Sequence, residues 1–258
     1  MRFVGGTGAI VSALASSLPD SSIRLGARVT HVALSGQEVE VGFAEANGTE
    51  HNVNAAQVLF SLPPRLLEAT VVFSPALDAA TARFWRDTPT WMAPHAKFFA
   101  IYDRPFWRDA GLSGTAQSMV GPLVEVHDAT TASGQAALFG FLGVPAEQRP
   151  AFGSDAIIAA SVRQLAQLFG PQAGMPRATL VKDWAADPLT ATEDDWQAGG
   201  HPIPTNHPGV GGEWRDLVSL AGSETSRSEP GYLAGAVDAA ERAVEEIVDK
   251  LKRAKAGL

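Results

Sequence analysis

The chain has 258 residues, no cysteine and a formal net charge of −8 at pH 7, because 28 Asp and Glu outnumber 20 Lys and Arg. This length can hold one large domain or two modest ones with a sizeable core. The acidic balance argues against a surface for nucleic acid or anionic lipid. The lack of cysteine excludes disulfides, thiolate metal sites and a cysteine-linked cofactor.

The hydropathy pattern predicts neither a membrane span nor a secretory signal. The densest apolar run, residues 136–144, is shorter than the roughly 18 to 20 residues that a spanning helix needs, and it is typical of a buried strand. The start of the chain, Met-Arg-Phe-Val-Gly-Gly, lacks the apolar core of a signal peptide. We therefore expect a cytoplasmic protein without membrane contact.

The first part of the chain predicts a short helix followed by strands. Apolar residues recur at helical spacing over 9–18, and Pro19 ends that helix. Alternating apolar residues then indicate strands, and Asn47-Gly48 predicts a hairpin because both residues tolerate positive φ. The elements expected here are strands over 23–34, 39–43, 51–53 and 57–62, and a helix that begins at 65.

The remainder mixes strands with two longer helices. Residues 155–169 have one apolar face and are followed by Gly170-Pro171, which ends a helix. The last helix is expected over 231–255, with Leu233, Val237, Ala240, Val244, Ile247 and Leu251 as its apolar stripe. Strands are expected over 97–102, 123–126, 137–142 and 180–184, with a Gly/Pro-rich connection over 185–212. This order predicts an α+β fold with a mixed, largely antiparallel sheet.

The sequence lacks the motifs of several other kinds of catalytic or binding site. The six histidines have no HxxxH or HxxE spacing, and His201 and His207 are separated by a proline-rich loop, so no metal site is expected. Neither a GxSxG elbow nor a P-loop occurs. No strand-GxGxxG-helix unit is found either, because Gly6-Thr-Gly8 is followed by Val11 where the third glycine should stand.

The most informative stretch is Ala221-Gly-Ser-Glu-Thr225, which is followed by Gly231-Tyr-Leu-Ala-Gly-Ala-Val237 and the last helix. Glycine permits close approach of a ligand, and a helix start offers unpaired N–H groups and a positive dipole end. This pattern suits the closing half of a flavin site. A plain turn with an N-cap is the alternative.

Six segments occur together in a distinctive order and spacing. They are 3–8, 28–32, 57–64, Lys97 with 102–107, Asp183-Trp184 and 221–237. In this combination the chain resembles the C-terminal half of a flavin-containing amine oxidase of the monoamine oxidase type. The resemblance implies a substrate domain over 63–215 and parts of an incomplete FAD-binding domain over 1–62 and 216–258.

The resemblance also implies roles for individual residues on the cofactor side. Val29 would present its backbone to the adenine, and the amide of Leu233 would face the carbonyl edge of the flavin. Gly222, Ser223 and Glu224 would lie along the pyrophosphate and ribityl chain, and Trp184 belongs to the cofactor side. A cysteinyl link to FAD is impossible because cysteine is absent.

Lys97 and Tyr232 are the implied catalytic residues. Lys97 would reach the flavin N5 through a water, with a solvated strand lysine as the alternative. Tyr232 would form one wall of an aromatic cage for the amine, with a buried core tyrosine as the alternative. No tyrosine occupies the second cage position near 199–202, where His201 and Pro202 stand. His201 and Trp196 are therefore the further substrate-side candidates, and Trp184 is open as well.

By resemblance, the function is oxidation of a small-molecule amine by hydride transfer to FAD, with oxygen as the acceptor and hydrogen peroxide as a product. We expect this chain alone to be inactive, and FAD binding by it alone to be doubtful. Two kinds of partner are consistent with the sequence: further copies of this chain, which would form a homo-oligomer, and a complementing N-terminal flavin-binding half. The alternative function is a flavin-free binding module, or an inactive truncated copy, that keeps the fold.

Overall fold

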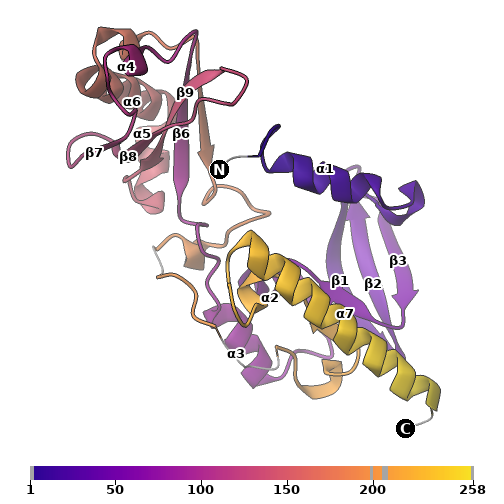
Figure 1. Ribbon diagram of the computed structural model, residues 1–258. Helices are drawn as coiled ribbons and strands as arrows, with labels where there is room; N and C mark the ends of the chain where they lie inside the picture. Colours follow the sequence, from indigo (N-terminus) through magenta and orange to yellow (C-terminus); the bar gives the residue numbers. More distant parts are fainter. Residues whose placement is uncertain (1–2, 198–199, 205–208, 257–258) are drawn as a thin grey trace. The chain divides into compact units, whose positions relative to one another are not determined.

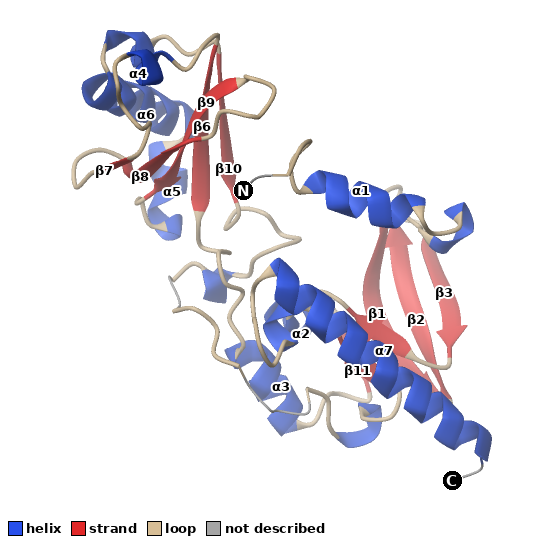
Figure 2. Cartoon of the chain, viewed as in Figure 1, coloured by secondary structure: helices blue, strands red, loops and turns tan. Residues whose placement is uncertain are grey.

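A computed structural model describes residues 3–197, 200–204 and 209–256, so His207 and Gly199 lie outside the described part. The chain forms two compact units, each built from two stretches of sequence. One contains Met1–Ile23 and Met92–Ala198, and the other contains Arg24–Trp91 and Gly199–Leu258. Figure 2 shows that both units combine helices and strands, as expected of an α+β fold. The functional division at residues 62 and 215 stays a prediction.

The first unit is built on a five-stranded antiparallel sheet with the order β10-β6-β9-β8-β7. Burial alternates along β6 and β9, so every second side chain enters the core. Helix α6 (Ser154–Phe169) packs on that face, and Gly170 ends it with a φ of 93°. The strands are β6 (Ala96–Tyr102), β7 (Ala116–Gln117), β8 (Leu123–Asp128), β9 (Ala136–Leu142) and β10 (Ala178–Asp183).

Shorter helical segments also belong to this unit. Helix α1 (Gly8–Ser16) buries none of its residues, whereas the short α4 buries Phe106 and Trp107 in the core beside Tyr102. The segments are α4 (Phe106–Asp109), α5 (Arg149–Phe152), and the 3-10 turns η1 (Asp20–Ser22), η2 (Ala146–Gln148), η3 (Pro171–Gly174) and η4 (Glu193–Asp195).

The second unit contains a four-stranded sheet with the order β3-β2-β1-β5. The Asn47-Gly48 turn is confirmed: the Asn47 side chain accepts from the amide of Thr49, and Gly48 has a φ of 82°. Strands β1, β2 and β3 are antiparallel neighbours, and β5 joins β1 in parallel. Their bounds are β1 (Ala27–Ser35), β2 (Glu38–Glu45), β3 (Glu50–Ala55) and β5 (Val72–Ser74).

A second, smaller sheet pairs β4 (Val58–Phe60) with β11 (Val218–Leu220) in parallel. Helices α2 (Pro64–Thr70) and α3 (Ala79–Asp87) complete this unit (Figure 1). The core is aromatic, with the ring of Phe73 5.4 Å from that of Trp85 and 5.2 Å from that of Trp214. The indole N–H of Trp214, in η5 (Gly212–Trp214), donates to the Pro75 carbonyl over 3.0 Å.

The last helix, α7 (Leu233–Ala256), packs through its small residues. Gly235, Ala239 and Ala243 are buried at intervals of four residues, and α7 contacts β11 and η6 (Ser223–Thr225). The expected apolar stripe is therefore not its core face. Leu233, Val237, Val244 and Leu251 are all exposed, because the residues of smaller volume face the unit and permit close packing of helix on strand.

A buried serine ties the start of α7 to the loop before it. The hydroxyl of Ser226 donates to Asp238 over 2.6 Å and accepts from the amides of Ser228 and Glu229. The bond from the Ser226 hydroxyl is the main cause that lowers the pKa of Asp238. A Cβ on Gly235 would overlap the Glu229 carbonyl oxygen, so the loop lies directly against the helix backbone.

The sequence predicted most elements within a few residues of their observed bounds. It missed the helix α3 and the short elements β5, β7, β11, α4 and α5. Two of these are strands of three residues, which are too short to show alternation. Helix α3 mixes polar and apolar residues, and Asp78 caps it by accepting from the amides of Ala80 and Thr81.

Gly235→Ala should lower the thermal midpoint of the chain by several degrees. The added methyl group must displace the Glu229 carbonyl, which should cost about 1–3 kcal/mol. Gly8→Ala is the control, because nothing lies within 4 Å of its added Cβ. Thermal unfolding by circular dichroism tests this, and equal midpoints for the two variants would contradict the close contact.

Candidate functional site

The Gly222–Thr225 turn begins where β11 ends. Gly222 is buried, and a Cβ there would lie 2.8 Å from the Leu62 carbonyl oxygen, so only glycine fits without movement. Glu224 is also buried, and Ser223 is half-buried. The amide of Gly231 donates to the Ser223 carbonyl over 3.2 Å, which folds the following loop back onto this turn.

The start of α7 presents backbone amides beyond this turn. The Ala236 amide donates to the Tyr232 carbonyl as the first bond of the helix, so the amides of Leu233 and Ala234 precede it. The Leu233 side chain is exposed. Together with the glycine turn, this arrangement offers N–H groups and the positive end of a helix dipole.

Three aromatic rings gather beside the start of α7. The Tyr232 ring lies 4.9 Å from the ring of Trp91 and 4.9 Å from that of His201, and the last two rings are 4.4 Å apart. Tyr232 is 43% exposed, so it is not a buried core residue. Gly231, with a φ of 80°, lies against Trp91, since a Cβ there would be 3.2 Å from the indole ring.

Trp91 was not singled out from the sequence. Its partners stand far along the chain, and no periodic pattern surrounds it, so only the fold reveals it. His201 occupies the position that lacks the expected tyrosine, and its ring meets Trp91 edge-on and Tyr232 at a tilt. Among the described residues, the trio of Trp91, His201 and Tyr232 therefore assembles two of the predicted substrate-side residues with one new one.

Val29 lies in the same unit, on β1, opposite Phe43 of β2. The register of this pair shifts between Val29 and His31, which marks a bulge. A bulge leaves one backbone residue without its ladder partner and redirects the strand locally. Five of the predicted cofactor-side residues thus belong to the second unit, namely Val29, Gly222, Ser223, Glu224 and Leu233, whereas the sixth, Trp184, belongs to the first.

Lys97 belongs to the first unit, on the sheet face that α6 does not cover. It is directly opposite Phe141 of β9, and its ammonium nitrogen lies 5.2 Å from the centroid of that ring. Phe139 continues this face and stacks on Phe99 at 5.6 Å and on His127 at 5.1 Å. Lys97 is therefore half-buried beside aromatic rings, rather than a solvated strand residue.

Trp184 and Trp196 lie in the first unit as well. The ammonium nitrogen of Lys182 lies 4.5 Å from the Trp184 ring, and the Trp184 amide donates to the His95 carbonyl. The Trp196 indole N–H donates to the Ala185 carbonyl over 3.2 Å. Neither tryptophan belongs to the unit that holds the aromatic trio.

A buried arginine fixes the start of the Lys97 strand. Arg149 donates to Asp183 over 2.6 Å, to the Pro94 carbonyl over 2.5 Å and to the Val144 carbonyl over 2.9 Å. Burial lowers the pKa of the neighbouring His95, and the cations of Arg149 and Lys97 lower it further. His95 is therefore neutral at physiological pH.

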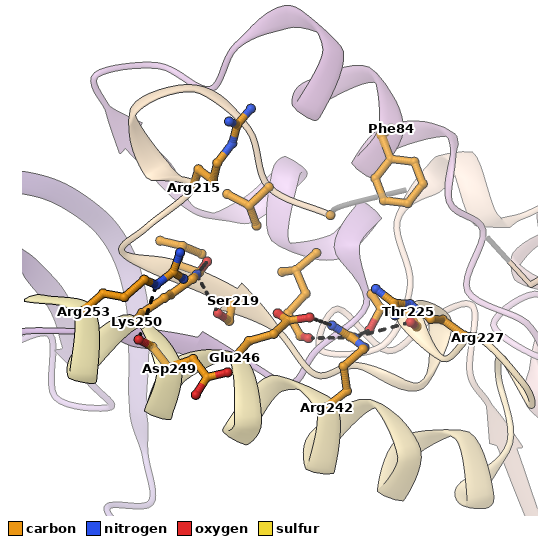
Figure 3. A pocket seen from close by; sticks show the side chains of 14 residues that line it. Phe84, Arg215, Ser219, Thr225, Arg227, Arg242, Glu246, Asp249, Lys250 and Arg253 are labelled. Atoms are coloured by element: carbon orange, nitrogen blue, oxygen red, sulfur yellow. Dashed lines mark hydrogen bonds and ion pairs between the residues drawn. The ribbon is translucent and has the colours of Figure 1, made fainter. Parts of the chain in front are cut away.

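A cavity of about 320 Å³ lies beside β11 and contains none of the predicted site residues. Arg242 and Lys250 of α7 reach its floor, and Arg215, Arg227 and Arg253 stand around it (Figure 3). Two carboxylates, Glu246 and Asp249, also line it, so cations predominate among its charged groups, unlike in the aromatic trio. Within the described residues, no three His, Asp or Glu side chains are arranged to hold a metal ion. Helices in the described ranges lack the apolar length that a bilayer crossing demands.

Comparisons with known proteins were made for the whole chain. Residues 1–248 match the family model of the flavin containing amine oxidoreductases. The "Probable flavin-containing monoamine oxidase A" of Dictyostelium discoideum is 27% identical and is matched over 98% of this chain and 54% of its own length. An L-amino acid dehydrogenase of Synechocystis is 27% identical over 96% of this chain and 51% of its own.

A solved structure gives the same fold. Cyclohexylamine oxidase from Brevibacterium oxydans superimposes with a TM-score of 0.75 over 96% of this chain and 53% of its own, at 22% identity. The chain thus spans about half the length of the relatives that it matches. The match to the family model over nearly the whole chain, together with the fold, places it among the flavin-containing amine oxidoreductases.

Proposed function

We propose that this chain forms the substrate side and part of the flavin side of an FAD-dependent amine oxidase. The observation that carries the proposal is the glycine turn at 222–225, which leads into α7 beside an exposed aromatic trio. A polypeptide that supplies the rest of the flavin site, such as a complementing N-terminal half, would complete the enzyme. The particular amine is not assigned.

The residues present fit a flavin in part. Gly222 leaves a side-chain-free surface, and the first amides of α7 could stabilise negative charge on a reduced flavin. When bound, FAD would accept the hydride equivalent from the carbon next to the amine nitrogen. The comparisons do not fix the electron acceptor, because one relative is named a dehydrogenase and not an oxidase. Oxygen is the acceptor in this proposal.

The chain's own residues would position the substrate. The ring faces of Tyr232 and Trp91 can orient an amine through their π systems and exclude water around it. Lys97 would hold a water and a positive charge at the reacting end of the flavin. Its place on a central strand that is paired on both sides suits that role, because the backbone from which the side chain extends is fixed.

Binding of FAD tests the proposal directly. We expect the chain alone not to bind FAD with sub-micromolar affinity, since dinucleotide recognition in doubly wound folds needs a glycine-rich strand-turn-helix that this sequence lacks. Addition of the half of the Brevibacterium cyclohexylamine oxidase that this chain does not cover should give stoichiometric binding, measured by flavin fluorescence. Tight binding by the chain alone would contradict the first expectation. A complex without flavin would favour the flavin-free module.

Lys97→Met should slow oxygen consumption at least about tenfold in the flavin-loaded protein, which corresponds to about 1.4 kcal/mol of barrier. The physical reason is loss of a cation beside the site where charge develops during flavin reoxidation. Lys252→Met, at an exposed position of α7, is the control. Stopped-flow measurement of flavin reoxidation tests the step, and an unchanged rate would return Lys97 to a structural role.

Tyr232→Phe should keep most of the catalytic efficiency, whereas Tyr232→Ala should lose about 1–3 kcal/mol of transition-state stabilisation. Phenylalanine preserves the ring face that meets Trp91, and alanine removes it. Steady-state kinetics with one amine across the variants give kcat/KM for each. Equal damage from both substitutions would show that the hydroxyl is essential. No effect from either would place Tyr232 outside the substrate site.

A further inference from the structure

The cavity of about 320 Å³ beside β11 is separate from the candidate flavin and amine sites. All the residues that line it belong to the second unit. Gly222 and the ring of Tyr232 are not among them. Pockets for small molecules typically range from about 300 to 1,000 Å³, so this cavity suits a small ligand.

Basic side chains predominate around this cavity. Five Arg and Lys side chains line it against two carboxylates, which gives a local excess of three positive charges in a chain of net charge −8. A concave surface lined mainly by one sign of charge attracts ligands of the opposite sign. The basic residues are Arg215, Arg227, Arg242, Lys250 and Arg253, and the acidic ones are Glu246 and Asp249.

Two of these cations are held in place by β11. Lys250 donates to the Val218 carbonyl and to the Ser219 hydroxyl, each over 3.1 Å. Arg242 donates to the Leu220 carbonyl over 3.2 Å (Figure 3). Because these bonds form without a ligand, binding of a ligand does not have to order the two long side chains, and less conformational entropy is lost.

The two carboxylates of the cavity already have cationic partners. Glu246 lies 3.0 Å from Arg242, one turn away on α7. Asp249 lies 3.6 Å from Lys252, which does not line the cavity. Neither carboxylate is therefore the counter-ion of the other basic residues around the cavity.

Three guanidinium groups at the cavity take part in no ion pair within the described residues. They belong to Arg215, Arg227 and Arg253, whose side chains are all exposed. Cations in the last turns of a helix complement its dipole, which accounts for Arg253 but not for Arg215 or Arg227, since these two precede α7. A guanidinium group presents a fork of N–H donors that matches the oxygens of a phosphate or carboxylate.

The ammonium group of Lys250 is only partly hydrated. Lys250 is half-buried, and burial is the main cause that lowers its pKa. The neighbouring cation of Arg253 lowers that pKa further, whereas Glu246 and Asp216 raise it. The protonated form is thus less stable here than in water, and an anion in the cavity would stabilise it.

One part of the cavity wall is apolar. Phe84 of α3 is half-buried there, and Val210 also lines the cavity. In Figure 3, Phe84 and Arg215 stand on the side of the cavity opposite α7, which carries Lys250 and Arg253. A ligand in the cavity can therefore contact basic groups and apolar surface at the same time.

We propose that this cavity is a binding site for a small organic phosphate. The phosphate group would lie between Arg215 and the pair of Lys250 and Arg253, and the apolar part of the ligand would contact Phe84 and Val210. A phosphate monoester carries about −1.5 to −2 charges at pH 7 and three acceptor oxygens, so it can bond to several of these groups, whereas a carboxylate has one charge and two oxygens. The site goes beyond the proposed oxidase function and does not depend on it.

Calorimetric titration of the intact chain with phenyl phosphate tests the site without FAD or amine. We expect one molecule to bind at low ionic strength with a Kd below about 1 mM, and the thermal midpoint of the chain to rise with its concentration. Inorganic phosphate should bind more weakly, because it lacks the apolar part. Phenol, which lacks the charge, should not bind.

Substitutions locate the bound phosphate. Arg215→Gln combined with Arg253→Gln should weaken binding of phenyl phosphate at least about tenfold, because two charge-assisted donors are lost. Arg163→Gln combined with Arg177→Gln is the matched control, since it removes two exposed arginines of the first unit and changes the net charge equally. Circular dichroism checks the fold of both double variants.

The outcomes either support or overturn the site. Binding that the control keeps and the first double variant loses supports it. Absence of binding overturns it, as does equal affinity of the two double variants. Inorganic phosphate that binds as tightly as phenyl phosphate overturns the assignment to an organic phosphate. If the first double variant fails to fold, nuclear Overhauser effects from the phenyl protons to Phe84 and Val210 of the unmodified chain decide, and their absence in the complex overturns the site.

Discussion

The parallel pairing of β4 with β11 is the interaction on which the second unit depends. It brings Val58 beside Val218 and so closes a very long loop of chain. The entropy cost of that closure grows only slowly with loop length, but the loop must close before contacts between distant residues can stabilise the fold. The Trp214 side chain and the aromatic core around Phe73 supply those contacts. The glycine turn and the start of α7 take their positions from the end of β11.

Local patterns in the sequence predicted much of this architecture. The apolar-rich runs of β6 and β9 identified both strands, and Asn47-Gly48 identified a hairpin, because each signal resides in neighbouring residues. Strand β11 gave no such signal, since Val-Ser-Leu is buried at all its positions and is held by a strand from the other end of the sequence. Helix α3 was missed because its stability comes from the Asp78 cap and from tertiary packing of Trp85.

The candidate site also contains residues that the sequence could locate and residues that it could not. The resemblance of residues 221–237 to a family motif located the glycine turn, and the structure gives the physical reason for Gly222 in its closeness to Leu62. Trp91 could not be found because its role depends on rings more than a hundred positions away. Helix α7 illustrates a further limit. The sequence pattern revealed an apolar stripe of large residues on one face and a row of small residues on another. Either face could be the buried one, and only the packing of the helix against the unit determines which.

The stripe on α7 also has an electrostatic consequence. Acidic residues Glu241 and Glu245 lie beside its aliphatic side chains on the exposed part of the helix, whereas Asp249 forms an ion pair with Lys252, in a chain whose net charge is already −8. Two copies that met through this face would bring like charges together as they buried apolar surface, and that repulsion lowers both affinity and encounter rate. A partner with basic residues around its own apolar face would be attracted from a distance instead. The charge pattern therefore selects among partners before any contact forms.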